Sequence, residues 1–312
     1  MSGIAVLGSI NMDLVTQVKS FPRPGETVLA QGFARFPGGK GANQAVACGR
    51  LGAPVFMYGL VGDGTFAADL LTSLQENQVR TEAIQCRAQV PSGVATILVD
   101  ERGENLIAVA PGANGLLDQS YLDTVIAQIS SADLLLLQLE ITLQATDRLL
   151  EALPPSRKRP LVILDPAPAA ELCEIYAQRI AIITPNESEL ASLTGMKLSS
   201  ESDIEQAANL LRQETGIETV ICKCGARGAY LSLAETFRHF PGYQVQAIDT
   251  TAAGDAFNGG LAVALVQGKP LTEAIPYANA VAALSVARPG AQASMPTRSQ
   301  VASFITEQGV PI

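Results

Sequence analysis

Ile4-Ala5-Val6-Leu7-Gly8-Ser9-Ile10-Asn11-Met12-Asp13 joins an aliphatic run to a glycine and then to polar side chains. A short aliphatic run that ends in glycine is typical of a buried strand. Similar runs recur at 55–61, 134–139, 161–164, 180–184 and 219–222. Segments with helical character lie between them at 43–50, 65–77, 120–130, 143–153, 187–193 and 202–214. This alternation predicts an α/β fold with a mostly parallel central sheet and helices on both faces.

Two segments, 14–36 and 93–109, interrupt the alternation. Each contains short alternating stretches, such as Thr27-Val28-Leu29-Ala30, beside turn residues. They predict antiparallel hairpins inserted in the α/β body. We therefore divide the chain into a main α/β domain (1–13, 38–92 and 111–312) and a small β lid (14–37 and 93–110). The small sheet is either an edge decoration or a lid over an active site. Further along, 254–286 is rich in small and apolar residues and predicts two closely packed helices.

Composition limits the possible functions. The chain has 312 residues, a formal net charge of −9 and a single histidine, His239. One histidine excludes most zinc sites and most mechanisms with a histidine base. The longest basic run is Arg157-Lys158-Arg159, which favours a solvated loop over a nucleic-acid patch. A phosphate site in so acidic a protein has to be local, built from backbone amides, helix N-termini and a few cations.

The cysteines and the apolar runs point to a cytoplasmic enzyme without a membrane partner. Five cysteines at irregular spacing disfavour a disulfide framework, and Cys222-Lys223-Cys224 lacks the second ligand pair of a metal site. Residues 1–7 do not have the pattern of a secretory signal, and the apolar runs are too short to span a bilayer.

The stretch with the strongest chemical signal is Asp249-Thr250-Thr251-Ala252-Ala253-Gly254-Asp255-Ala256-Phe257-Asn258. Ala253 and Gly254 are small enough for a phosphate to approach the backbone, and a helix is expected to begin there with free N–H groups. Asp255 in the first turn could take a proton from an alcohol while these amides hold a phosphoryl group. Alternatively, Asp255 is simply an acidic residue at a helix N-terminus.

Two further stretches carry groups suited to a sugar. Gly38-Gly39-Lys40-Gly41-Ala42-Asn43-Gln44-Ala45 offers a pliable backbone and the Asn43 amide, although it could also be a plain glycine loop before a helix. Asn11 and Asp13, after the first strand, could together hold a vicinal diol or could form an Asx turn. The chain has no Gly-x-x-x-x-Gly-Lys-Ser/Thr motif, which excludes a Walker-type phosphate loop.

Two more loops follow predicted strands. Asn186 and Glu189, in Thr184-Pro185-Asn186-Glu187-Ser188-Glu189, lie one turn apart and could face hydrated Mg²⁺ or cap a helix. The 224–228 loop, Cys-Gly-Ala-Arg-Gly, could lie along a nucleotide or form a tight turn. Ligands bind beyond the carboxyl ends of strands in open α/β sheets, so these loops together predict a ligand cleft.

These motifs, together with Gln138-Leu139-Glu140, Pro166-Ala167-Pro168-Ala169 and Gly290-Ala291-Gln292, resemble the ribokinase-like carbohydrate kinase family. They run in the family's order from residue 8 to residue 292. The resemblance implies ATP-dependent phosphorylation of D-ribose at O5. A related kinase for deoxyribose, fructose or a nucleoside is the alternative, and a non-catalytic sugar-binding protein is a further one.

The resemblance also implies roles for individual residues. Asp255 is implied to be the base, with Ala252, Ala253 and Gly254 as the anion hole. The implied sugar-binding residues are Asn11, Met12, Asp13, Gly39, Lys40, Gly41, Ala42, Asn43, Glu140 and Asp255. The implied ATP-binding residues are Asn186, Lys223, Cys224, Gly225, Ala226, Arg227, Gly228, Gly254, Asp255 and Asn279.

The resemblance implies two cations and an assembly. Glu189 would organise Mg²⁺ through water. A monovalent cation, K⁺, would be held by Asp249, Thr251, Ser285, Arg288, Gly290 and Ser294. A homodimer is implied as well. The chain departs from the family pattern at Lys223, where threonine is common, and at Asp165, where asparagine is common. The Lys223 ammonium would either strengthen triphosphate binding or point to solvent.

Overall fold

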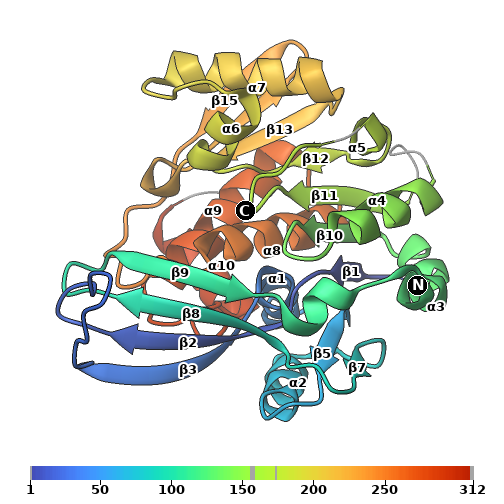
Figure 1. The fold of residues 1–312 in the computed structure, drawn as a ribbon. Helices are drawn as coiled ribbons and strands as arrows, with labels where there is room; N and C mark the ends of the chain where they lie inside the picture. The colour runs from blue at the N-terminus through green and yellow to red at the C-terminus, as the bar shows by residue number, and fades with distance from the viewer. Residues whose placement is uncertain (1, 155–158, 173, 310–312) are drawn as a thin grey trace.

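The computed structural model describes residues 2–154, 159–172 and 174–309. Met1, Cys173 and two members of the basic run, Arg157 and Lys158, lie outside this description. Within the described residues, the larger sheet has nine strands (Figure 1). In spatial order they are β15 (Thr236–Phe240), β14 (Ala229–Leu233), β13 (Thr219–Lys223), β12 (Ile182–Ile183), β11 (Leu161–Asp165), β10 (Leu134–Gln138), β1 (Ile4–Leu7), β4 (Val55–Tyr58) and β6 (Val79–Arg80). The pairs from β13 to β6 are parallel, whereas β14 and β15 join antiparallel.

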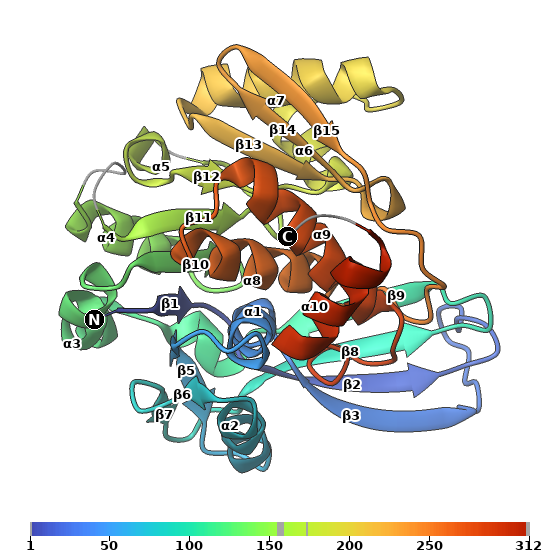
Figure 2. The same ribbon diagram turned by 180° about the vertical axis from the view of Figure 1, so that it is seen from behind.

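Helices cover both faces of this sheet, as Figures 1 and 2 show from opposite sides. One face carries α1 (Lys40–Arg50), α2 (Ala67–Glu76), α8 (Ala253–Val266), α9 (Leu271–Val286) and α10 (Arg298–Glu307). The other carries α3 (Gln119–Ser130), α4 (Leu143–Ala152), α5 (Glu174–Arg179), α6 (Glu187–Thr194) and α7 (Glu201–Thr215). Successive residues of β1 alternate between the two cores, with Ile4 in the first and Ala5 in the second. The predicted α/β class is therefore confirmed, and burial on both faces explains the aliphatic runs.

The prediction of one strand at 55–61 is wrong, because this segment forms two strands. The chain leaves the main sheet at Gly59, whose N–H donates to the Tyr121 hydroxyl at 2.7 Å. The next strand, β5 (Leu60–Gly62), pairs with β7 (Gln85–Arg87) outside the main sheet. An aliphatic run shows that both strands are buried, but it does not show where the chain changes its pairing partner.

The smaller sheet has the order β3 (Gly32–Gly38), β2 (Asn11–Gln17), β8 (Gly93–Val99), β9 (Asn105–Ala110). Its two antiparallel pairs, β2–β3 and β8–β9, confirm the predicted hairpins, and β2 joins β8 in parallel. The expected strand at 27–30 is wrong. That stretch lies in the loop between β2 and β3, with Leu29 91% exposed, because residues 32–38 pair along β2 instead.

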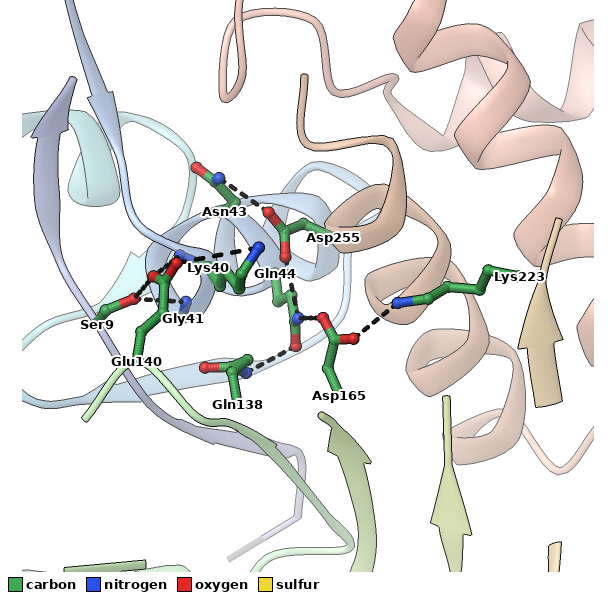
Figure 3. Close-up of polar contacts among 10 residues, drawn as sticks. All are labelled: Ser9, Lys40, Gly41, Asn43, Gln44, Gln138, Glu140, Asp165, Lys223 and Asp255. Atoms are coloured by element: carbon green, nitrogen blue, oxygen red, sulfur yellow. Dashed lines mark hydrogen bonds and ion pairs between the residues drawn. The ribbon is translucent and has the colours of Figure 1, made fainter. Parts of the chain in front are cut away.

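Small residues bring α8 close to its neighbours. A side-chain carbon on Gly259 would lie 2.4 Å from the Ala47 methyl group of α1, and one on Gly260 would lie 3.1 Å from Ala278 of α9. The predicted helix pair in 254–286 is confirmed as α8 and α9. The packing of α8 against α1 sets the N-termini of these two helices side by side, where Asn43 contacts Asp255 (Figure 3).

In the part of the chain that the structure describes, no helix combines the length and the apolar character needed to cross a membrane.

Candidate active site

The N-terminus of α8 is the centre of the site. Its N-cap residue, Ala252, has a left-handed conformation with φ 59°, which is uncommon and costly for a residue other than glycine. Among the described residues, no side chain hydrogen-bonds to cap this helix end. The Ala253 N–H donates to the Thr250 carbonyl at 3.3 Å, whereas the Gly254 N–H has no partner among the described residues. The Gly254 N–H is therefore available to an anion, and the helix dipole favours negative charge there.

Asp255, in the first turn of α8, is held by two amide side chains (Figure 3). Asn43 Nδ2 donates to its Oδ2 at 2.9 Å, and Gln44 Nε2 donates to its Oδ1 at 3.0 Å. Burial raises the pKa of Asp255 to about 6; Lys40 lowers it and Asp165 raises it. A carboxylate with a pKa near neutrality is suited to accept a proton from an alcohol.

On one side of Asp255 lies a group of polar side chains from β2, α1 and the loop after β10. Glu140 Oε2 accepts hydrogen bonds from Ser9 Oγ at 2.6 Å and from the Lys40 backbone N–H at 3.1 Å. Asn11 Oδ1 accepts a hydrogen bond from Asn114 Nδ2 at 2.7 Å. The Asn43 Oδ1 atom is buried and has no hydrogen-bond partner among the described residues. Buried acceptors are rarely left unpaired, so this atom points to a ligand with a hydroxyl group.

The same group contains Asp13, whose side chain is only 8% exposed. Burial above all, and then the charges of Glu140 and Asp255, raise the pKa of Asp13 to about 7 against the opposing effect of Lys40. Burial alone would lower the pKa of Lys40, but the carboxylates of Asp255 and Glu140 raise it. Several carboxylates thus share one ammonium group in a small, largely buried volume.

On the other side of Asp255 lies a cavity of about 420 Å³. Most of the predicted ATP-binding residues line it, namely Asn186, Lys223, Gly225, Ala226, Gly228, Gly254, Asp255 and Asn279. Residues outside the motifs selected from the sequence also line it, including Tyr243, Gln244, Val245 and Val286. Residues 241–248 show no periodic pattern, so their place at the cavity depends on the fold alone.

Cys224 and Arg227 do not line the cavity. The Cys224 side chain is buried, with its Sγ 3.6 Å from Cys222 Sγ. Arg227 forms an ion pair with Glu187 at the surface. Within the 224–228 loop the backbone and the small residues therefore face the cavity, and the two larger side chains turn away from it.

The structure confirms one of the two alternatives for Asn186 and Glu189, the helix cap. They form a reciprocal capping box at the start of α6, with both hydrogen bonds at 2.8 Å. Both also line the cavity. Burial raises the pKa of Glu189, although Lys223 lowers it. The Lys223 ammonium does not point to solvent: it is 12% exposed and lies 2.7 Å from Asp165 Oδ1.

The residues proposed for a monovalent cation form one local cluster. The Asp249 carboxylate joins its two segments, since it accepts from the Thr251 N–H at 2.9 Å and from the Gly290 N–H at 2.8 Å. Burial opposes its ionisation, but these hydrogen bonds lower the pKa of Asp249 overall. Ser285 and Ser294 are fully buried. The Arg288 backbone N–H donates to the Ser285 carbonyl at 3.3 Å. The cluster therefore offers carboxylate, hydroxyl and carbonyl oxygens, which are hard ligands suited to K⁺.

Four of the residues predicted to bind sugar are packed closely against their neighbours. Met12 is 2% exposed in the core. A side-chain carbon on Gly41 would lie 2.7 Å from Gly8, and the Ala42 N–H donates to the Ser9 carbonyl. Gly39 has φ +89°, and a side-chain carbon there would lie 2.8 Å from Ser9 and Asn11. These residues set the shape of the loop against β1.

Ser9, Gln44, Asn114 and Gln138 belong to the site but were not selected from the sequence as functional residues. Each of them hydrogen-bonds to a selected residue or to another of the four. Ser9, Gln44 and Gln138 lie within motifs that were singled out in the sequence. Their motifs were the available signal, but which members of a motif touch the base depends on the tertiary contacts.

A buried carboxylate at the N-terminus of a helix, between a polar group of side chains and a cavity, is an arrangement suited to phosphoryl transfer. The family described as pfkB family carbohydrate kinase matches residues 1–298. A ribokinase of Haemophilus influenzae is 41% identical over 302 residues, covering 97% of this chain and 98% of its own length. A deoxyribokinase of Salmonella typhimurium is 36% identical over 305 residues, covering 97% and 98%. The solved structure of an Arabidopsis thaliana ribokinase complexed with ribose and ATP matches with a TM-score of 0.90 at 30% identity, covering 98% of this chain and 99% of that one.

The chain therefore belongs to the pfkB family of carbohydrate kinases. It is an ATP-dependent sugar kinase, which confirms the resemblance and the enzyme class expected from its motifs.

Proposed function

We propose that this kinase transfers the terminal phosphate of ATP to the 5-hydroxyl of D-ribose. The observation that carries the proposal is the place of Asp255, between the polar group with the unpaired Asn43 oxygen and the cavity that ends at α8. The names of the relatives support ribose as the sugar.

In the proposed step, Asp255 takes the proton of the sugar hydroxyl, and the hydroxyl oxygen forms a bond to the terminal phosphorus of ATP. The bond from that phosphorus to the bridging oxygen breaks, and its electron pair leaves with ADP. The backbone amides of Ala252 to Gly254 would hold the negative charge of the transferring group. Asp255 then releases its proton to solvent when the products leave.

The polar group would hold the sugar. Asn11 and Asp13 would bind neighbouring hydroxyls, and Lys40, Asn43, Glu140 and the Gly39 backbone would complete the contacts. A site built to bind a hydroxyl rejects an analogue that lacks it, because buried polar groups are then left unpaired. This favours ribose over 2-deoxyribose, the substrate type named for the Salmonella relative.

A coupled kinase assay tests the proposed function. We expect kcat/KM to be higher for D-ribose than for 2-deoxyribose, D-fructose and adenosine. If kcat/KM is higher for one of the other three compounds, that compound and not ribose is the substrate. Binding of ribose without any sugar-dependent ADP formation would make the chain a sugar-binding protein.

The cavity would hold ATP. Its apolar wall and Asn279 would surround the adenine ring, and the 225–228 loop would lie along the nucleotide. Asn186 and Glu189 would hold Mg²⁺ through water, since their amide and carboxylate oxygens are the ligands that this ion prefers. Bound Mg²⁺ would neutralise charge on the phosphates. The oxygen cluster around Asp249 would hold K⁺ and so fix the backbone that leads into Ala252.

We also propose that the smaller sheet is a lid and that it joins two copies of the chain. Its outer strand β9 is exposed along its whole length, and Leu106, Ile107 and Val109 are about half exposed. Phe33 on β3 is 63% exposed. A sheet with open edges and exposed apolar residues is a surface for pairing with another chain. Light scattering should give the mass of a dimer for the wild type and of a monomer for Ile107→Lys.

A further inference from the structure

A buried chain of polar contacts joins Lys223, on β13, to the base Asp255 (Figure 3). Lys223 Nζ donates to Asp165 Oδ1 at 2.7 Å. Gln44 Nε2 donates to Asp165 Oδ2 at 3.0 Å and to Asp255 Oδ1 at 3.0 Å. One amide group therefore bridges two carboxylates, and the ammonium holds the far oxygen of the second one.

A fourth side chain fixes the direction of this amide. Gln138 Nε2 donates to Gln44 Oε1 at 2.7 Å, so the nitrogen of Gln44 has to face the two carboxylates. Gln44 and Gln138 are fully buried, and Asp165 is 2% exposed. Each of the four side chains has at least one hydrogen bond within this network, and among their buried polar atoms in the described part of the chain Gln138 Oε1 has no partner. Hydrogen bonds inside a protein are stronger than in water, so this network favours one arrangement of the Gln44 amide.

Lys223 lies at the place where the proposed phosphate would bind. A side-chain carbon on Gly254 would be 3.3 Å from Lys223 Nζ, so the ammonium lies over the first turn of α8. Among the described residues that line the cavity, Lys40 and Lys223 are the only cations, beside the carboxylates of Asp165, Glu189 and Asp255. Since a nucleotide adds more negative charge, its terminal phosphate needs a cation at this end of the cavity.

We propose that Lys223 contacts the terminal phosphate of the bound nucleotide, and that Asp165 and Gln44 are positioning residues which hold this ammonium and the base Asp255 in a fixed relation. The inference rests on the proposed phosphoryl transfer and deepens it. An ammonium has three donors, so Lys223 can keep its bond to Asp165 and still donate to a phosphate oxygen. The contact is stronger for a triphosphate than for a diphosphate, because only the triphosphate extends to α8.

The first test compares two nucleotides and does not involve a sugar. Titration calorimetry with Mg²⁺ measures the affinity for ADP and for AMP-PNP, an ATP analogue that is not hydrolysed. The variant is Lys223→Met with Asp165→Asn, which removes both charges and keeps an acceptor for Gln44. We expect affinity for AMP-PNP to fall at least about tenfold while that for ADP changes less than about threefold. An unchanged ratio of the two affinities overturns the proposal for Lys223.

Two variants act as controls. Lys269→Met removes an ammonium whose partner is Glu273 on α9, outside the cavity, and should leave both affinities unchanged. If the double variant does not fold, Lys223→Gln takes its place, because it removes the charge but keeps a donor for Asp165. The ratio of the AMP-PNP and ADP affinities then tests the proposal in the same way. A wild type that binds both nucleotides but does not phosphorylate ribose contradicts the proposed substrate and leaves this comparison intact.

The second test concerns the positioning residues and uses the pH dependence of kcat/KM. The charged groups that face Asp255 are Lys40 on α1, Asp165 on β11 and Asp13 on β2. The Gln44 hydrogen bond lowers the pKa of Asp255, whereas the Asp165 charge raises it. Gln44→Met should therefore move the acid limb to higher pH, and Asp165→Asn should move it to lower pH. A general loosening of the site would not shift the two acid limbs in opposite directions. If the limbs of both variants move in the same direction or do not move, Gln44 and Asp165 do not position Asp255.

Discussion

Asn43 and Asp255 are 212 positions apart in the chain, and the amide nitrogen of Asn43 lies 2.9 Å from the carboxylate of Asp255. The contact joins the first turns of α1 and α8. It leaves the other amide atom of Asn43, its oxygen, buried and unpaired beside the base. The residue that orients the proposed base is thus also placed to bind the hydroxyl group that the base would deprotonate.

The first prediction concerns this base. Asp255→Asn keeps the shape of the side chain but cannot accept the proton. We expect turnover to fall by about a hundredfold or more, while the affinities for ribose and ATP stay within a few fold. Steady-state kinetics and calorimetry measure these quantities. Turnover close to that of the wild type would remove Asp255 from the mechanism.

The second prediction concerns pH. The pKa of Asp255 is about 6 and that of Asp13 about 7, and both have to be ionised to act as acceptors. The value of kcat/KM for ribose should therefore fall as the pH drops through 7 and 6, because this ratio reports groups of the free enzyme. A profile from pH 5 to pH 9 measures it. A flat profile down to pH 5 contradicts the assignment of these carboxylates.

The third prediction is that the buried charge of Asp13 lowers the free energy of unfolding at high pH. The folded state raises the pKa of Asp13, so between about pH 4 and 7 it binds more protons than the unfolded state. Its contribution to stability therefore declines as the pH rises through that range. Asp13→Asn removes the buried charge and should raise the free energy of unfolding at pH 8 by on the order of 2 kcal/mol. The same change should weaken ribose binding by about 1.5–3 kcal/mol.

Urea unfolding at pH 8 and ribose calorimetry measure the two effects. Glu205→Gln, which changes an exposed carboxylate on α7, is the control and should alter neither quantity. Unchanged ribose affinity in Asp13→Asn would show that Asp13 does not hold the sugar. A loss of stability at pH 8 would show that the buried charge is compensated in the folded protein.

The fourth prediction concerns the monovalent cation. K⁺ bound near Asp249 would act by fixing the backbone before the anion hole, so it should raise turnover more than it raises ribose affinity. Na⁺ is smaller and should support less activity. Asp249→Ala should lower turnover to the level of the K⁺-free wild type. A K⁺ titration at constant ionic strength tests this, and a flat wild-type response would show that the cluster does not hold an activating ion.

The sequence by itself determined the elements of the fold and the motifs of the site. Aliphatic runs with helical segments between them are enough to predict parallel strands, because burial on both faces of a sheet requires continuous apolar residues. Asp255, Asn43 and Gly254 were selected because their residue types suit a base, a hydroxyl acceptor and a phosphate approach. The order of these motifs along the chain was enough to identify the family.

Only the tertiary structure decided which of these residues touch. Hydrogen bonds reach about 3 Å, so a shared Gln44 amide between Asp165 and Asp255 depends on the packing of three separate elements. The direction of the Lys223 ammonium, toward Asp165 and not toward solvent, depends on the same packing. The wall formed by residues 243–247 had no local pattern to predict it. The sequence specifies which groups are available, and the close approach of α1, α8 and the strand ends decides which of them act together.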